Sequence, residues 1–219
     1  AVVDPQLEIA PYLEALAQKS MRITHIIETH VHADHLSGAR RLAEVTGAPV
    51  FVHESADVRF PHGDLEDGDE HEVGNVLLNV LHTPGHTPDG VSILVTDRTR
   101  SPEPWFVLTG DTLFAGSVGR PDLGGEGSEV RLAEQLYASL FGRLLSLPDH
   151  LEIYPEHFGG AACGKGLSGK PASTIGFERR FNPALRLVDS ADFVRFVLAD
   201  LPPQPEAFAE NRRRNLGWA

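Results

Sequence analysis

The sequence predicts an α/β fold. Stretches with the apolar spacing of strands alternate with stretches that have the spacing of helices, as in proteins whose helices pack on the faces of sheets. With 219 residues, of which 41% are hydrophobic and 23% are charged, the chain can build one large domain with a substantial core. We therefore expect a single domain over residues 1–200, followed by a Pro-rich tail or linker over residues 201–219.

Strands are expected where residues are β-branched or alternate in polarity. These stretches are residues 1–5, 22–29, 48–53, 76–83, 91–96, 104–110 and 151–155. Helices are expected over 7–20, 36–47 and 128–147, with Gly47 as a helix stop and Ser128 as a helix N-cap. The acidic, turn-rich residues 63–75 are expected to form a solvated loop and hairpin.

A histidine-rich stretch, THVHADHLSG at residues 29–38, follows directly on an expected strand. On an extended chain His30 and His32 point to the same side, so both can face one metal ion. Asp34 and His35 lie where the chain turns toward the next helix, and they can face a second ion or the surroundings of the first. For Asp34 a simpler alternative is open, namely that it caps this helix.

More metal-type side chains follow later strands. His82 and His86 lie in HTPGHT, Asp111 lies in LTGDTLF, and His157 lies in YPEHFGG. Each alone is weak evidence, because a lone histidine is usually structural and a carboxylate after a strand is often a turn residue. Together with the histidine-rich stretch they place such side chains at successive strand ends, which is how an α/β fold assembles a site along one edge.

Charge and composition argue against several classes of function. The net charge of −12 disfavours a nuclease, and it disfavours nonspecific binding to nucleic acid or to an anionic membrane. No apolar run approaches the roughly 20 residues of a membrane span. Cys163 is the single cysteine, so an intrachain disulfide is impossible, and a reducing, cytoplasmic location is expected.

The order and approximate spacing of the metal-type residues resemble those of the metallo-β-lactamase superfamily, and the resemblance spans nearly the whole chain. The residues that carry it are His30, His32, Asp34, His35, His86, Asp111 and His157. The resemblance implies a catalytic domain built as an αββα four-layer sandwich, with the metal site at one edge. Members usually carry further strands before the segment that corresponds to residues 1–5, so we expect this chain to lack its N-terminal strands.

Two subfamilies fit this set of residues. Glyoxalase II is a binuclear thioester hydrolase, and persulfide dioxygenase is a mononuclear iron enzyme. The chain has Gly119-Arg120-Pro121-Asp122, which resembles the Gly-Arg-x-Asp of persulfide dioxygenases, whereas glyoxalase II usually has Phe-Glu after the Gly-Arg. Residues 162–185 also resemble the persulfide dioxygenases that are often fused to rhodanese domains. We therefore expect a persulfide dioxygenase, with a binuclear zinc hydrolase as the alternative.

The resemblance also implies a ligand set and a reaction. One Fe(II) per chain would be held by His30, His86 and Asp111, with zinc as the alternative metal. Two imidazoles and one carboxylate leave three positions of an octahedral ion open, here for the outer persulfide sulfur and for O₂. The substrate would be a low-molecular-weight thiol persulfide, glutathione persulfide by default, and the products would be sulfite and free thiol.

Four further residues are expected to assist catalysis. They would lie around the ion, orient its ligands and form hydrogen bonds to bound water or oxygen. They are His32, Asp34, His35 and His157.

An anionic substrate in an acidic protein requires a locally basic pocket. Cations near the loops of the site are Arg120, Lys165, Lys170, Arg179 and Arg180. The residues expected to bind substrate are Arg120, Asp122, Cys163, Lys165 and Arg179. Two alternatives stay open: a structural pair between Arg120 and Asp122, and a surface role for Arg179 and Arg180.

Cys163 lies in a glycine-rich loop close to Lys165. A nearby cation favours the thiolate, so this residue could accept a persulfide sulfur or sense substrate. A small buried apolar residue is the simpler interpretation. A non-catalytic sulfur-carrier module that works through Cys163 is a third hypothesis. A rhodanese domain or protein and a second copy of the chain are the other partners that we consider.

Overall fold

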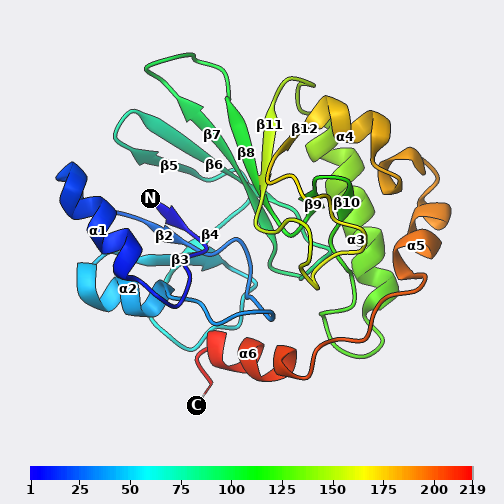
Figure 1. Cartoon of the computed structure of the whole chain (residues 1–219), viewed down its shortest axis with the longest axis horizontal. Coiled ribbons are helices and arrows are strands. Elements are labelled where there is room, and N and C mark those ends of the chain that lie inside the picture. Colours follow the sequence, from blue (N-terminus) through cyan, green and yellow to red (C-terminus); the bar gives the residue numbers. More distant parts are fainter. Residues whose placement is uncertain (219) are drawn as a thin grey trace.

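Two β-sheets lie face to face in the middle of the protein, and helices cover the outer face of each (Figure 1). The computed structural model describes residues 1–218. Successive residues of a strand point to opposite faces of its sheet, so neighbours belong to different layers. Ile26 packs among the helices, whereas Ile27 packs between the sheets. In the other sheet, Val107 packs among the helices and Leu108 packs between the sheets. This four-layer αββα arrangement confirms the predicted fold.

The first sheet has four parallel strands in the order β1-β2-β3-β4. The bounds are Val2–Val3 for β1, Ile26–Ile27 for β2, Val50–His53 for β3 and Gly63–Leu65 for β4. Its outer face is covered by α1 (Ala10–Lys19) and α2 (Ala39–Thr46), both predicted from the sequence. Gly47 ends α2 in the left-handed conformation, with φ of 73°.

The second sheet has six strands in the order β12-β11-β8-β7-β6-β5. The bounds are Glu70–Val73 for β5, Val76–His82 for β6, Val91–Asp97 for β7, Phe106–Gly110 for β8, Glu152–Pro155 for β11 and Ser173–Thr174 for β12. β8 and β11 run parallel, whereas the other neighbouring strands are antiparallel. A separate hairpin consists of β9 (Leu113–Phe114) and β10 (Ser117–Val118).

A second helical layer covers the outer face of this sheet. It contains α3 (Glu129–Gly142), η1 (Leu144–Ser146), α4 (Ile175–Phe181), η2 (Ala184–Arg186) and α5 (Ser190–Leu198). Leu132, Leu136 and Leu140 are fully buried, one helical turn apart on α3. The last two pack with Val107 and Ile153 of the sheet. No helix in residues 1–218 is both long and apolar enough to cross a membrane.

Three local expectations differ from the structure. The helix after the histidine-rich stretch begins at Ala39 with Gly38 as its N-cap, so the alternative that Asp34 caps it is wrong. Ser128 does occupy the N-cap position of α3, but its hydroxyl donates to the carbonyl of Gly125 at 2.6 Å instead of capping the helix. The strand expected over residues 22–29 is confined to β2.

Residues 201–218 fold back against the histidine-rich stretch, although the sequence suggests a Pro-rich tail or linker there. They contain α6 (Ala207–Asn215), which lies below the first sheet in Figure 1. Phe208 of this helix is buried in a small apolar cluster with Ala33, Leu123 and Cys163. The C-terminal segment therefore contributes to the surroundings of the histidine-rich stretch.

Candidate metal centre

The metal-type residues predicted from the sequence meet at one edge of the sandwich. They follow β2, β6, β8 and β11, as expected. Because β8 and β11 are adjacent and parallel, Asp111 and His157 leave the sheet at the same edge. The His157 Nε2 atom lies 3.7 Å from an Asp111 carboxylate oxygen. His82 has a different partner: its ring stacks on that of His53, with centroids 3.8 Å apart.

His30, His86 and Asp111 form the deeper half of the centre. The Asp111 Oδ2 atom lies 3.3 Å from His86 Nε2 and 3.9 Å from His30 Nε2. The three residues are buried, with at most 4% of their surface exposed. One donor atom of each lies within 4.8 Å of the others, close enough for a single metal ion to contact all three. The structure therefore places the three predicted ligands together.

The Gly-Arg-x-Asp segment orients His86. The backbone carbonyl of Arg120 lies 2.9 Å from His86 Nδ1 and accepts a hydrogen bond from its N–H, so the unprotonated Nε2 is the atom that faces Asp111. Gly119 is required for this approach, because a Cβ atom there would lie 2.0 Å from the carbonyl of Asp111 and 3.0 Å from the His86 Cβ. Gly119 and Arg120 therefore help to hold His86, a predicted ligand, in place.

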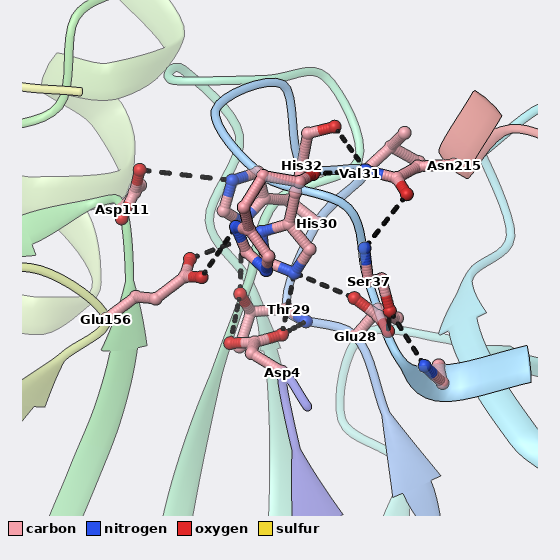
Figure 2. A network of polar contacts seen from close by, with 12 residues as sticks. Asp4, Glu28, Thr29, His30, Val31, His32, Ser37, Asp111, Glu156 and Asn215 are labelled. Atoms are coloured by element: carbon pink, nitrogen blue, oxygen red, sulfur yellow. Dashed lines mark hydrogen bonds and ion pairs between the residues drawn. The ribbon is translucent and has the colours of Figure 1, made fainter. Parts of the chain in front are cut away.

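A threonine and an aspartate orient His30 (Figure 2). The Thr29 hydroxyl donates to Asp4 Oδ2 at 2.9 Å, so it accepts from His30 Nδ1, which lies 3.0 Å away. The Nε2 atom of His30 therefore faces the centre as the free acceptor. Asp4 also accepts from the Thr29 backbone N–H at 2.7 Å, which fixes the end of β1 to the start of the histidine-rich stretch.

His32 lies between carboxylates on both sides of its ring. Its Nε2 atom lies 2.7 Å from Glu28 and 3.2 Å from Asp4, and its Nδ1 atom lies 3.2 Å from Glu156. Burial lowers the pKa of this imidazole, but Glu156 and Glu28 more than compensate and hold the pKa well above its usual value. The pattern favours the predicted role of His32 as a residue around the ion rather than a ligand.

Asp34, His35 and His157 form the more accessible half, with side chains 16% to 18% exposed. The Asp34 carboxylate joins the two imidazoles, at 3.2 Å from His35 Nδ1 and 3.1 Å from His157 Nε2. Although burial raises the pKa of Asp34, the hydrogen bonds from His157 and His35 hold it far below its usual range.

The two halves differ in the charge of their histidines. Burial is the main reason why the pKa of His30 lies well below its usual value and why the pKa of His86 falls to about 4. Burial also lowers the pKa of His157, but the hydrogen bond to Asp34 and the charge of Asp111 raise it to about 9. At neutral pH the deeper imidazoles are therefore neutral, as a metal ion requires, while His157 carries a proton in the metal-free protein.

The donor set fits a divalent metal ion. Within the described residues, His30 Nε2 and both Asp111 carboxylate oxygens are buried without a hydrogen-bond partner. Such atoms are costly to bury unless a ligand satisfies them. A neutral imidazole pair with one carboxylate is the donor set of mononuclear Fe(II) sites, and imidazole with carboxylate also suits zinc.

Arg120 and Asp122 are paired with each other. The Arg120 guanidinium donates to the two carboxylate oxygens of Asp122 at 2.7 and 2.8 Å, and to the carbonyls of Ala162 and Pro202. Burial raises the pKa of Asp122, but the bond from Arg120 holds it below its usual value. The structure supports the structural alternative for this pair, since the guanidinium joins three segments of the protein instead of facing the centre.

The other predicted cations lie farther out. The Lys165 ammonium is half exposed and donates to the carbonyl of Ala199 at 3.1 Å. Lys165 and Arg120 both border a cavity of about 230 Å³ between β10 and α5. Arg179, on α4, donates to the Leu145 carbonyl and pairs with Asp149, which is the surface role left open by the sequence.

Cys163 is buried, with 1% of its surface exposed. Its sulfur nevertheless lies within 4.8 Å of donor atoms of Asp34 and His157, so the thiol borders the centre. Burial and the Asp111 carboxylate raise the pKa of this thiol, and Lys165 points elsewhere. The expectation that a nearby cation favours the thiolate is therefore wrong, and the simpler interpretation of a small buried residue holds.

Sequence reasoning missed several residues of the centre, among them Glu28, which lies 2.7 Å from His32. Asp4 ends the first strand, where a carboxylate resembles an ordinary turn residue. Glu156 precedes His157, and an alternating strand would point these two side chains in opposite directions. Asn215 belongs to the expected tail, yet it bonds to the backbone of the histidine-rich stretch. Local patterns gave no signal for the contacts of the other three, because each depends on segments distant in the chain.

Comparison with known proteins identifies the family. Residues 2–157 match the family described as the metallo-beta-lactamase superfamily. A solved structure of a metallo-beta-lactamase from Staphylococcus aureus subsp. aureus COL has a TM-score of 0.91 and 33% sequence identity, and the match covers 99% of this chain and 65% of that chain. The chain belongs to the metallo-beta-lactamase superfamily, a group of metal-dependent hydrolases and oxygenases.

Two relatives carry different activities in their names. The human mitochondrial persulfide dioxygenase ETHE1 is 29% identical over 206 residues, which cover 94% of this chain and 73% of the relative. A hydroxyacylglutathione hydrolase from Rhodopseudomonas palustris (strain BisB18) is 32% identical over 212 residues, which cover 95% of this chain and 74% of the relative. Overall identity is therefore similar for both, and the choice between the activities depends on the site.

Proposed function

We propose that this chain is a mononuclear non-heme iron dioxygenase that oxidises a low-molecular-weight thiol persulfide, such as glutathione persulfide. The observation that carries the proposal is the contact between the Gly-Arg-x-Asp segment and His86. Gly119 packs on Asp111 and His86, and the Arg120 carbonyl fixes the His86 tautomer. Asp122, which distinguishes this segment from the Gly-Arg-Phe-Glu of glyoxalase II, pairs with the Arg120 guanidinium and so helps to hold the residue whose carbonyl orients His86.

The unequal halves of the centre also support one metal ion. His30 and His86 are buried and neutral, whereas the pKa of His157 is raised to about 9 beside Asp34. A protonated imidazole is not a metal ligand, so the deeper half is the better site for a first ion. The proposed assignment is Fe(II) on His30, His86 and Asp111.

The overall reaction consumes the persulfide, O₂ and water, and it yields the thiol, sulfite and two protons. The S–S bond breaks, the outer sulfur gives up four electrons, and O₂ takes up four. When bound, the iron would supply the template and the electronic coupling between sulfur and O₂. The Thr29 hydroxyl and the Arg120 carbonyl hold the two ligand imidazoles in orientation. His157, protonated and partly accessible, can donate a hydrogen bond to the bound substrate.

A binuclear thioester hydrolase is the second candidate. It is favoured by the close grouping of Asp34, His35 and His157, which could hold another ion if His157 lost its proton. The relative named as hydroxyacylglutathione hydrolase fits this function. The sulfur-carrier hypothesis has less support, because Cys163 is buried and its pKa is raised.

An oxygen electrode distinguishes the two enzymes. The iron-loaded protein is given glutathione persulfide, glutathione or S-lactoylglutathione, and thioester cleavage is followed in parallel by absorbance. We expect O₂ uptake with the persulfide alone, because only this substrate has an outer sulfur to oxidise. Rapid thioester cleavage without persulfide-dependent O₂ uptake would reject the dioxygenase and support the hydrolase.

Metal analysis of protein purified without oxygen provides an independent test. The dioxygenase assignment predicts about one iron per chain. Two fully occupied metals per chain would reject it, because the second would have to lie among Asp34, His35 and His157.

A further inference from the structure

Glu156 enters the metal centre because of an irregularity at the end of β11. The register between β11 and β8 shifts between Tyr154 and Pro155. Such a bulge changes the direction of the side chains that follow it. The Glu156 backbone N–H then donates to the Gly110 carbonyl at 3.2 Å, next to Asp111. As a result Glu156 and His157 both face the centre, although they are neighbours in the sequence.

The Glu156 carboxylate lies among the imidazoles of the site (Figure 2). One oxygen is 3.2 Å from His32 Nδ1 and 3.8 Å from His157 Nε2, and the other is 3.7 Å from His35 Nδ1. The side chain is only 7% exposed. In the part of the chain that the structure describes, neither oxygen has a hydrogen-bond partner. A buried carboxylate requires a cation to balance its charge, and in the metal-free protein the imidazole of His32, 3.2 Å away, is the nearest group that can supply one.

The Glu156 carboxylate also lies close enough to His30, a predicted ligand, for one ion to contact both. Donor atoms of His30, His32 and Glu156 lie within 4.8 Å of one another, as do those of His30, His86 and Asp111. Within residues 1–218, His30 Nε2 is buried and has no hydrogen-bond partner. The two groups share His30, so the carboxylate lies next to a ligand of the deeper half.

We propose that Glu156 is a fourth protein ligand of the ion held by His30, His86 and Asp111, an inference that rests on the proposed iron centre. Two carboxylates balance the charge of a divalent ion, whereas the three-residue set leaves one positive charge. An octahedral ion with four protein ligands keeps two open positions. Two are sufficient for one persulfide sulfur and one O₂ side by side.

The proposal is tested by anaerobic titration of the metal-free protein with Co(II), whose absorption spectrum reports its ligands, and with Fe(II) against a competing chelator. Glu156→Gln keeps the size of the side chain and removes its charge. We expect at least about tenfold weaker binding of both ions, and a changed Co(II) spectrum. Glu152→Gln is the matched control, because this carboxylate lies on the same strand and accepts a bond from the Tyr154 hydroxyl instead.

Unchanged affinity and an unchanged Co(II) spectrum in Glu156→Gln would overturn the proposal and leave Glu156 as a partner of His32 only. If Glu156→Gln does not fold, Glu156→Asp serves in its place. It keeps the charge but shortens the reach, so we expect weaker binding, and affinity equal to the wild type would overturn the proposal. The titrations use no persulfide, so their outcome is independent of the dioxygenase assay. A protein without dioxygenase activity can still bind metal through Glu156. Conversely, a persulfide dioxygenase can bind its metal without Glu156.

Discussion

The side chain of Asn215 donates a hydrogen bond of 2.8 Å to the backbone carbonyl of His35, 180 residues away in the chain. The same amide nitrogen donates to the carbonyl of His32 at 2.9 Å, and the amide oxygen accepts from the Ser37 N–H at 3.0 Å. One side chain of α6 therefore fixes three backbone groups of the histidine-rich stretch (Figure 2). Asn211 adds a bond of 3.0 Å to the carbonyl of Ala33.

Replacement of Asn215 by Asp should loosen the metal centre. The variant keeps the size of the side chain and its acceptor, but it loses two donors and places a carboxylate against two carbonyls. We expect about tenfold weaker metal retention and a loss of about 2 kcal/mol in the free energy of unfolding, at about 1 kcal/mol for each hydrogen bond. Chelator-driven metal release and thermal unfolding measure these effects.

Asn211→Asp is the matched control, because it removes one donor next to Ala33 and leaves the carbonyls of His32 and His35 bonded. A smaller effect is expected. Equal metal retention in the wild type and in Asn215→Asp would show that α6 does not position the ligands.

Removal of the proposed ligands should separate the two halves of the centre. His86→Ala and Asp111→Ala each delete a donor of the deeper half, so we expect loss of iron binding. His157→Ala should keep the iron but lower the rate about 10- to 100-fold, as expected for residues around a metal ion. Iron content and O₂ uptake are measured on the same preparations. Complete loss of iron from His157→Ala would contradict the assignment of a single ion to the deeper half.

Cys163 should be unreactive in the folded protein. It is packed with Phe114, Leu123 and Phe208, and burial together with Asp111 disfavours its thiolate. We expect alkylating reagents to label it at the rate of unfolding, which mass spectrometry can follow with and without urea. Rapid labelling of the native protein would instead support the sulfur-carrier hypothesis. Cys163→Ser supplies the unlabelled control.

Two histidines of the centre, His157 and His86, should make the stability of the metal-free protein depend on pH in opposite directions. His157 has a folded pKa of about 9, above the ordinary value of 6.5, so its contribution is complete below 6.5 and is lost as the pH rises through 9. His86 has a folded pKa of about 4, so the unfolded chain binds its proton more readily between 6.5 and 4, and stability falls as the pH falls through this range.

Urea unfolding between pH 4 and pH 10, after removal of metal, measures both effects. His157→Gln should flatten the alkaline side of the profile and leave the acid side unchanged. A wild-type profile that is flat from pH 6.5 to 9 would contradict the proposed ion pair with Asp34.

Much of the fold and the ligand set follows from local pattern. Strand periodicity places residues such as Val107 and Ile153 in the core, and the helices predicted from spacing are present as α1, α2 and α3. The metal-type residues were predictable because a parallel pair of strands brings its ends to one edge, so a residue after β8 and another after β11 must meet.

The sequence by itself determined the α/β class and the placement of metal-type residues at successive strand ends, and its resemblance to the metallo-β-lactamase superfamily supplied the four layers. Tertiary structure alone decided that Arg120 turns to Asp122, that Cys163 is buried, that a bulge brings Glu156 inside, and that Asn215 reaches the histidine-rich stretch. The physical reason is one of range. Periodicity describes which face of its own element a residue occupies, whereas the partner of a buried charge or amide depends on segments that only the folded chain brings together.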